Sequence, residues 1–487
     1  MPLIDRTIET TELHDLATRP GHHLAILYGR RRIGKTFLLS SIWGELPYFY
    51  YLASDTTPAF NRHDFLRELA TFTGDDSLSA DDLPSWRFIF RELFGHRPDE
   101  PLVVVLDEFQ YLLGGEDDIR SQLVAVWDRL EREGPLLVVL SGSAVSTMSE
   151  LDGSQAALYG RIDWKRRLRP FDYWYAAQMM PYEARRDLII AYAVFGGTPE
   201  YLSGLTDAGS LKERIIAECL SPRGRVRHLV ETVIEQERGL RNVGDYRTIL
   251  AAVARGRTTL NEIADLSGLP LGTGLRRKVQ KLEELDLILG RRNFDAPKND
   301  PYRYHLADPA LRFNQSVVQS LRNELETTDP AALYDDYVEP RLQTHVGHIF
   351  EEVVRQAYLR LAPARALPLI RQWCSWDGLD RDRRPVEIDI VARQTKKAMT
   401  TGAVKWSRRP IGPGVFRDHL LALQRLTDSG YGWARQALAR DATLLFVSAA
   451  GFDDAFLQLA ATAEQEVLLW TLEDLFSPDA ATAPNLG

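Results

Sequence analysis

The stretch GRRRIGKT, residues 29–36, decides how the first part of the chain folds. It has the form G-x-x-x-x-G-K-T, and it stands between the apolar run 23–28 (HLAILY) and residues 37–43 (FLLSSIW), which are typical of a helix. In this pattern the glycines let the backbone wrap closely, so that its N–H groups point at phosphate oxygens. A chance Gly-Lys turn is the alternative, but the strand–loop–helix context favours a nucleotide-binding loop.

The side chains of this loop have predictable tasks. Gly29 and Gly34 supply the bends, Lys35 neutralises the β- and γ-phosphates, and the Thr36 hydroxyl ligates Mg²⁺. We therefore expect ATP and Mg²⁺ as cofactors.

Two further apolar runs end in polar residues suited to this chemistry. Residues 101–109 (PLVVVLDEF) contain Asp107, which can hold Mg²⁺ through water, and Glu108, which can orient or deprotonate the attacking water. The run LLVVLSGS ends in Ser141 and Ser143, either of which can sense the γ-phosphate, although a plain polar strand end is equally consistent. Continuous apolar runs of this kind predict a parallel sheet covered on both faces.

Arg161, in ALYGRIDWKRRLRPF, is the best candidate for an arginine finger. Phosphoryl transfer needs positive charge in the transition state, and a neighbouring subunit often supplies it. The alternative is a solvated or DNA-facing basic surface, because four more cations crowd the same stretch: Lys165, Arg166, Arg167 and Arg169.

Six short stretches occur in an order that resembles a known family: LIDRTIETTEL, YGRRRIGKT, LDEFQYL, LSGSAVSTM, LYGR and FGGTPEYL. Together they look like the archaeal-type P-loop ATPases, related to the AAA+ and STAND groups, in which a winged helix and a restriction-endonuclease-like domain of the PD-(D/E)XK type follow the ATPase. The resemblance implies nucleotide roles for Lys35, Thr36, Asp107, Glu108 and Ser143. It also implies a helical lid shaped by the element that contains Gly196, Gly197 and Pro199.

Composition limits the remaining possibilities. The chain has 487 residues, too many for one hydrophobic core, so several domains are expected. Cys219 and Cys374 are far apart and have no metal-ligand spacing, which fits a reducing cytoplasm. No run is long and apolar enough to suggest a membrane span, and no signal peptide is apparent. The net charge of −9 means that any nucleic-acid binding must come from a local basic face.

The fold class predicted for the chain is α/β, with several parts. We predict a P-loop ATPase core over 1–180, a helical lid over 181–238, a winged helix over 239–328, a restriction-endonuclease-like domain over 329–478 and a disordered tail over 479–487.

Residues 245–318 have the rhythm of a helix–turn–helix followed by a hairpin, with residues 271–288 (LGTGLRRKVQKLEELDLI) as the expected recognition helix. Basic side chains on this helix and the hairpin are candidates for DNA contacts: Arg276, Arg277, Lys278, Lys281, Arg291 and Arg292. A winged helix used only for packing or oligomerisation is the alternative, since Glu283, Glu284 and Asp286 dilute the basic face.

The last third of the chain predicts the helix–strand–strand–strand–helix–strand order of restriction-type nucleases. Such enzymes hold Mg²⁺ with carboxylates, and a Lys steadies the attacking water. Asp389, in PVEIDIVAR, and Glu351, on a long amphipathic helix, are the expected metal ligands, and Lys405 is the expected catalytic cation. Alternation along the strand predicts that Glu387 and Asp389 share one face. Mn²⁺ is a possible substitute for Mg²⁺ at this site.

Position 403 breaks the nuclease pattern. The resemblance implies Gly-Glu-x-Lys-Trp, and this chain has Gly-Ala-Val-Lys-Trp, with Ala403 in place of a metal-binding Glu. Loss of one carboxylate predicts a steep fall in metal affinity and rate. Because the rest of the signature is intact, an inactivating Glu→Ala change at Ala403 is one hypothesis, and a naturally inactive relative is the other.

We therefore expect a DNA-processing ATPase that assembles as a homo-oligomer through Arg161, and family analogy alone suggests defence against foreign DNA. Two other classes stay open. One is an ATP-driven signalling switch of the STAND type with an inactive C-terminal domain, and the other is a transcription regulator that uses only its winged helix.

Overall fold

The computed structural model describes residues 3–79, 84–97, 99–114, 118–205, 209–235, 237, 240, 242–395 and 398–478, so the predicted disordered tail lies outside the described residues. The chain forms two compact units. The first comprises residues 1–170 and 233–241, and the second comprises residues 171–232 and 242–487. Each unit is described by itself below.

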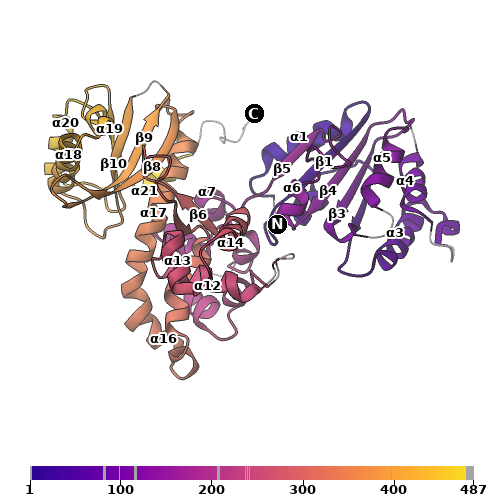
Figure 1. Cartoon of the computed structure of the whole chain (residues 1–487), viewed down its shortest axis with the longest axis horizontal. Coiled ribbons are helices and arrows are strands. Elements are labelled where there is room, and N and C mark those ends of the chain that lie inside the picture. Colours follow the sequence, from indigo (N-terminus) through magenta and orange to yellow (C-terminus); the bar gives the residue numbers. More distant parts are fainter. Residues whose placement is uncertain are drawn as a thin grey trace. The chain divides into compact units, whose positions relative to one another are not determined.

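The first unit is a parallel sheet with helices on both faces (Figure 1). Its strands are β1 (His22–Tyr28), β2 (Tyr48–Leu52), β3 (Leu102–Asp107), β4 (Leu136–Gly142) and β5 (Trp164–Arg167). Its helices are α1 (Thr7–Thr18), α2 (Lys35–Ser41), α3 (Pro58–Thr73), α4 (Trp86–Gly95), α5 (Ile119–Trp127) and α6 (Val145–Ser149).

The strand order of this sheet is β2-β3-β4-β1-β5, and every neighbouring pair is parallel. Strands β3 and β4 are buried along their whole length, because apolar side chains alternate between two cores, one on each face. The carboxyl ends of β1, β3 and β4 consequently lie along one edge, where the phosphate loop follows β1. The predicted strands β1, β3 and β4 are confirmed.

Strands β2 and β5 were not predicted. The basic run that offered an alternative role for Arg161 is β5, which lies at the edge of the sheet and pairs with β1. Its charges are compensated locally, since Lys165 pairs with Asp152 and Arg166 pairs with Glu12. Charged side chains are common on edge strands, where they discourage pairing with other chains.

The second unit begins with helices and a hairpin. The helices before the hairpin are α7 (Tyr173–Ala177), α8 (Arg185–Phe195), α9 (Pro199–Leu202), α10 (Leu211–Ile215), α11 (Arg225–Glu231), α12 (Val243–Ala254), α13 (Leu260–Ser267) and α14 (Thr273–Glu284). Strands β6 (Ile288–Arg291) and β7 (Arg303–Leu306) form an antiparallel pair. The element order of α12, α13, α14 and this hairpin is the one predicted for a winged helix.

A second five-stranded sheet, with the order β12-β11-β10-β9-β8, completes this unit (Figure 1). Its strands are β8 (Ile370–Leu379), β9 (Pro385–Gln394), β10 (Met399–Lys405), β11 (Thr443–Ser448) and β12 (Glu466–Trp470). The helices around and before it are α15 (Pro309–Phe313), α16 (Pro330–Leu333), α17 (Glu339–Leu361), α18 (Pro413–Asp428), α19 (Gly432–Ala437), α20 (Asp454–Ala461) and α21 (Leu472–Leu475). Strands β8, β9 and β10 are antiparallel, whereas β10, β11 and β12 are parallel.

Strand β9 contains an irregularity at Asp389. Cys374 of β8 pairs with Val391, but Trp376 pairs with Ile388, so an extra residue stands in β9 between these pairs. Such a bulge interrupts the alternation of side chains. The interruption falls after Ile390, whereas burial still alternates from Val386 to Ile390, so Glu387 and Asp389 stay together on the less buried side of the strand, as predicted.

Within the described residues, no helix is both long enough and apolar enough to cross a lipid bilayer.

Candidate nucleotide site and C-terminal carboxylate site

The phosphate loop connects β1 to α2 at the carboxyl edge of the first sheet. Gly29 (φ 156°) and Gly34 (φ 87°) both have positive φ, and a Cβ on Gly29 would stand 2.4 Å from the Leu168 carbonyl oxygen. Glycine is therefore required at the first bend on steric grounds. The binding of phosphate oxygens by backbone N–H groups of this loop stays a prediction.

Lys35 is buried at the centre of this loop, with 5% of its surface exposed. Its ammonium donates hydrogen bonds to the backbone oxygens of Gly29 (2.9 Å) and Arg30 (3.2 Å). Burial lowers the pKa of Lys35, although the carboxylates of Glu108 and Asp107 act in the opposite direction. The cation is thus held inside the loop, in reach of an anion that enters it.

The Asp107 carboxylate accepts hydrogen bonds from two hydroxyl groups. Oδ2 of this carboxylate accepts hydrogen bonds from Thr36 (2.7 Å) and Tyr50 (2.8 Å). Asp107 is fully buried at the end of β3, and the neighbouring carboxylate is one reason, after burial, that the pKa of Tyr50 is raised. A hydroxyl and a carboxylate oxygen side by side are the donor set that Mg²⁺ prefers, so the predicted metal ligands fit the ion.

Glu108 follows Asp107 in a left-handed conformation (φ 52°) that non-glycine residues rarely adopt. The Ser143 hydroxyl donates to its Oε2 over 2.7 Å, and Gln110 also donates to that oxygen. Ser143 thus lies next to the proposed water-activating carboxylate. Ser141 is buried within β4, and its hydroxyl has no hydrogen-bond partner among the described residues.

Sequence reasoning missed Glu237. This residue belongs to the segment 233–241, which packs with the first unit, and only 6% of its surface is exposed. Its carboxylate accepts a hydrogen bond from the Arg31 backbone N–H and lies in the electrostatic field of Arg30 and Lys35. Burial raises the pKa of Glu237 against the effect of these cations. An acidic side chain therefore accompanies the phosphate loop, and no local sequence pattern around it reveals this.

Arg161 lies at the opposite edge of the sheet from the phosphate loop. Asp163, two residues later, bonds to Leu24 near the start of β1. The Arg161 guanidinium makes two hydrogen bonds to Asp128, of 2.8 and 2.7 Å. It therefore cannot serve the nucleotide site of its own chain in this arrangement, and action on a neighbouring subunit stays a prediction.

In the second unit, Asp389 and Lys405 are brought together from adjacent strands. Asp389 Oδ2 accepts hydrogen bonds from the Val404 N–H (2.8 Å) and from Lys405 Nζ (3.1 Å). The two residues predicted for one site from different strands are thus in contact.

Glu351, on α17, lines the same cavity as Asp389. Burial, reinforced by the negative charge of Asp389, raises the pKa of Glu351 to about 7. Ala403 is 7% exposed and packs in an apolar cluster that includes Phe416 and Phe446. Across the described part of the chain, no three His, Cys, Asp or Glu side chains are gathered so that they could hold a metal ion.

The six basic residues predicted to contact DNA differ in their exposure and in their ion pairing within the chain. Arg276 and Arg277 are exposed on α14, and neither has an ion-pair partner among the described residues. Lys278 pairs with Asp245 at 3.5 Å, and Lys281 pairs with Glu284 at 3.5 Å. The hairpin residues Arg291 and Arg292 line the cavity that contains Glu351 and Asp389.

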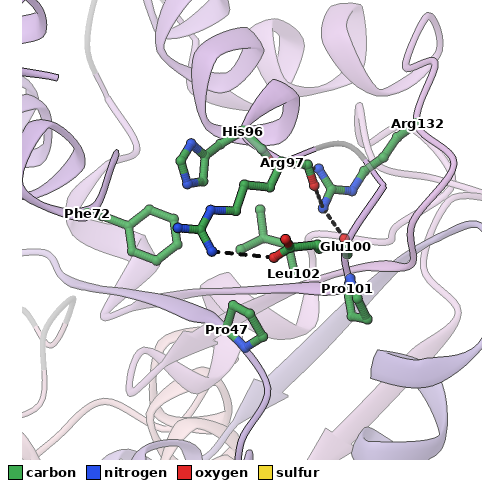
Figure 2. A pocket seen from close by; sticks show the side chains of 8 residues that line it. All are labelled: Pro47, Phe72, His96, Arg97, Glu100, Pro101, Leu102 and Arg132. Carbon is green, nitrogen blue, oxygen red and sulfur yellow. Dashed lines mark hydrogen bonds and ion pairs between the residues drawn. The ribbon is translucent and has the colours of Figure 1, made fainter. Parts of the chain in front are cut away.

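A small cavity of about 100 Å³ lies at the start of β3 and is shown in Figure 2. Arg132 donates hydrogen bonds to the backbone oxygens of Phe94 (2.8 Å) and His96 (2.9 Å), and also to those of Arg97 and Glu100. Arg97 pairs with the Glu100 side chain. Arg132 thus holds the backbone of residues 94–100, and Arg97 is paired within that segment, so both cations have a structural role.

Comparisons with known proteins bear on both units. Residues 3–205 match a family described as an ATPase domain predominantly from Archaea, and residues 315–412 match a family described as archaeal and bacterial proteins of unknown function. An uncharacterised protein of Methanocaldococcus jannaschii is 23% identical over 412 residues, which are 83% of this chain and 87% of that protein.

Solved structures similar to the chain include a Walker-type ATPase of Pyrococcus abyssi (21% identity, 65% of this chain, 96% of that chain, TM-score 0.48). The ORC2 protein of Aeropyrum pernix in ADPNP–ADP complexes is another (16% identity, 66% of this chain, 94% of that chain, TM-score 0.40). The match of residues 3–205 to this family model and the geometry of the phosphate loop together support a P-loop ATPase domain in this part of the chain.

Proposed function

We propose that the protein couples Mg–ATP hydrolysis in its first unit to DNA processing by a metal-dependent nuclease-type domain in its second unit. The observation that carries the second half of the proposal is the contact of Asp389 with Lys405, over 3.1 Å, together with Glu351, which lines the same cavity as Asp389. A carboxylate and an amine from adjacent strands, with a second carboxylate from a helix, are the groups that metal-dependent phosphodiester cleavage uses.

The nucleotide chemistry follows from the groups around the phosphate loop. Lys35 would exchange its backbone partners for phosphate oxygens, and Thr36 and Asp107 would hold the metal ion. When bound, Mg²⁺ neutralises charge on the phosphates. Glu108, held by Ser143, orients the attacking water and accepts its proton.

In the second unit, Asp389 and Glu351 are the proposed metal ligands, and Lys405 steadies the attacking water or the developing charge. Glu351 must lose its proton before it can ligate a cation, and its pKa of about 7 makes that step sensitive to pH near neutrality. The exposed guanidinium groups of Arg276 and Arg277 are the proposed first contacts with the DNA backbone.

Ala403 is the position at which this proposed site lacks a ligand. It lies between Gly402, which pairs with Ile390, and Val404, whose N–H donates to Asp389. We infer that cleavage is weak or absent in this chain, whether Ala403 arose by an inactivating change or is native. Its methyl group is enclosed by Phe416 and Phe446, so a longer side chain there has to displace apolar neighbours.

A homo-oligomer is part of the proposal, with Arg161 of one copy directed at the nucleotide of the next. The location of Arg161 at the edge opposite its own phosphate loop supports this arrangement. Asp128 holds the guanidinium in the isolated chain, and this partly exposed pair costs little to break.

The decisive experiment restores the carboxylate. Ala403→Glu is compared with the parent chain and with Ala403→Gln for cleavage of plasmid DNA, in Mg²⁺ or Mn²⁺ and with or without ATP. Ala403→Gln is the matched control, because it adds the same volume without a ligand charge. We expect cleavage by Ala403→Glu alone, and its loss on adding Asp389→Asn.

A folded Ala403→Glu variant that cleaves no DNA under any of these conditions contradicts the nuclease proposal. That result favours the second candidate, an ATP-driven assembly switch of the STAND type. Two observations favour that alternative: the apolar cluster around Ala403, and the absence of a three-ligand metal group among the described residues.

A further inference from the structure

A cavity of about 610 Å³ lies between the hairpin β6–β7 and the second sheet of the same unit. Residues of the hairpin region, among them Arg291, Arg292 and Tyr302, form one wall. Glu351 and Asp389, the proposed metal ligands, belong to the opposite wall. The hairpin region therefore lines the same cavity as the two proposed metal ligands. A cavity of this volume is within the range of small-molecule binding sites.

Tyr302 offers an aromatic surface in this wall. Half of the residue is exposed (51%), and its ring lies beside that of Tyr304, with centroids 6.3 Å apart and an interplanar angle of 29°. The Arg292 guanidinium carbon lies 5.3 Å from the Tyr302 ring centroid. An exposed aromatic ring next to a cation is the pairing with which proteins stack an unpaired base and hold its phosphate.

Arg292 has donor capacity that the protein itself does not use. Its Nε is buried, and it has no hydrogen-bond partner within the described residues. One terminal nitrogen donates to the Pro297 backbone oxygen. No carboxylate in the described part of the chain forms an ion pair with Arg292, whereas Arg291 is committed to Glu352 at 2.8 Å. A buried, unpartnered guanidinium N–H requires an explanation, and an anionic ligand in the cavity supplies one.

Two carboxylates of the cavity have cationic partners. Glu352 accepts hydrogen bonds from Arg291 and Arg355, and Asp389 is paired with Lys405. Asp295 also lines the cavity. Arg292, beside the exposed tyrosine, is a cation of this lining that has no ion-pair partner among the described residues.

We propose that this cavity binds a single-stranded DNA segment, with one base stacked on Tyr302 and its phosphate on Arg292. The inference rests on the proposed function and narrows its substrate to DNA that presents an unpaired strand. A base within a duplex has both faces covered by its neighbours, so Tyr302 can stack only on a base that has left the stack. The stacked nucleotide directs the adjoining backbone toward Glu351 and Asp389.

The test measures binding and does not depend on cleavage. The full chain is titrated against fluorescein-labelled oligothymidine in EDTA without nucleotide, and fluorescence anisotropy gives the affinity. Tyr302→Ala is expected to weaken binding roughly 5- to 150-fold, the equivalent of about 1–3 kcal/mol per stacked base. Tyr302→Phe keeps the ring and should bind as the parent does.

Two more variants distinguish the loss of a stacking contact from a general loss of folded structure. Arg292→Ala should weaken binding and reduce its salt dependence, because a phosphate contact is lost. Tyr337→Ala is the matched control, since Tyr337 is similarly exposed (46%) and lies outside the cavity. Blunt duplex DNA, which offers no unpaired base, should bind the parent and Tyr302→Ala equally.

Unchanged oligothymidine affinity in both Tyr302→Ala and Arg292→Ala overturns this inference and leaves the proposed function intact. Equal weakening of blunt duplex binding by Tyr302→Ala also overturns it, because the ring then has no role specific to an unpaired base. If the parent chain binds no DNA of any form, the proposed function fails together with this inference.

Discussion

The Thr36 hydroxyl donates a hydrogen bond of 2.7 Å to Asp107 Oδ2, and this contact joins the start of α2 to the end of β3. The two residues are separated by 71 positions in the chain, yet the parallel sheet brings them to the same edge. The pair that we propose as metal ligands is thus brought together by the fold itself.

Asp107→Asn should lower the rate of ATP hydrolysis by roughly 10- to 100-fold, as substitutions of outer-shell metal partners do. The amide keeps the shape of the side chain and removes the charge that holds Mg²⁺. Steady-state hydrolysis over a Mg²⁺ titration checks this, and a higher Mg²⁺ requirement is expected. Tyr50→Phe removes the other hydroxyl from Asp107 and should change the Mg²⁺ requirement far less.

Glu108→Gln should reduce hydrolysis by roughly 10²- to 10⁴-fold, the usual contribution of a general base. Affinity for a fluorescent ATP analogue should be almost unchanged, because Lys35 and Thr36 remain. Single-turnover hydrolysis and equilibrium binding separate the two effects. If binding and hydrolysis fell together, Glu108 would have a structural role in the phosphate loop and would not act by orienting the attacking water.

Glu237→Gln should raise the affinity for Mg–ATP by roughly tenfold or more, given that hydrogen bonds to charged groups are worth about 1.5–3 kcal/mol. The Glu237 carboxylate accepts a hydrogen bond from the Arg31 N–H and is attracted by the positive charge of Lys35. It therefore competes with the incoming phosphates for both groups. Isothermal titration calorimetry measures the change. Glu235→Gln is the control, because Glu235 is exposed on the same segment. A weaker affinity in Glu237→Gln would show that the carboxylate assists nucleotide binding instead.

Acid should destabilise the second unit through two buried histidines. Burial lowers the pKa of His345 and of His419 to about 4 in the folded chain. The unfolded chain takes up these protons near pH 6.5, about the ordinary histidine value. Between these two values the unfolded state binds more protons, so stability is lost as the pH falls through this window.

Thermal unfolding of the full chain at neutral and mildly acidic pH measures whether stability falls as the pH is lowered. His345→Gln should reduce the acid sensitivity, because the Nε2 that bonds the Ala193 carbonyl over 2.7 Å no longer carries a titratable group. His14→Gln, at an exposed position, should leave the pH dependence as it is in the parent. Equal acid sensitivity in all three chains would rule out His345 as a source.

The phosphate loop was predictable because residues 29–36 are contiguous and each position has a local steric or electrostatic reason. Strands β3 and β4 were predictable because both faces are buried, which leaves unbroken apolar runs. The tyrosine-rich strand β2 carries an aromatic signal of β-propensity that could have identified it. Strand β5 is charged and lies at an edge, so burial leaves no pattern in its sequence.

Other parts of the sites depend on contacts between distant segments. Glu237 approaches the phosphate loop from more than 200 positions away, and no periodicity marks it. The contact of Asp389 with Lys405 was expected from the motif, but the bulge beside Asp389 arises from the pairing of β9 with β8 and has no sequence signal. The role of the β6–β7 hairpin as a wall of the C-terminal cavity is likewise a tertiary property.

The most direct test of the central claim is the rate of ATP hydrolysis by the full chain with and without DNA that carries an unpaired strand. Lys35→Ala, which lacks the cation of the phosphate loop, sets the background. Coupling between the two units predicts that DNA stimulates hydrolysis by the parent and has no effect on Lys35→Ala. Hydrolysis that is identical with and without DNA would contradict a DNA-processing role and favour an ATP-driven switch.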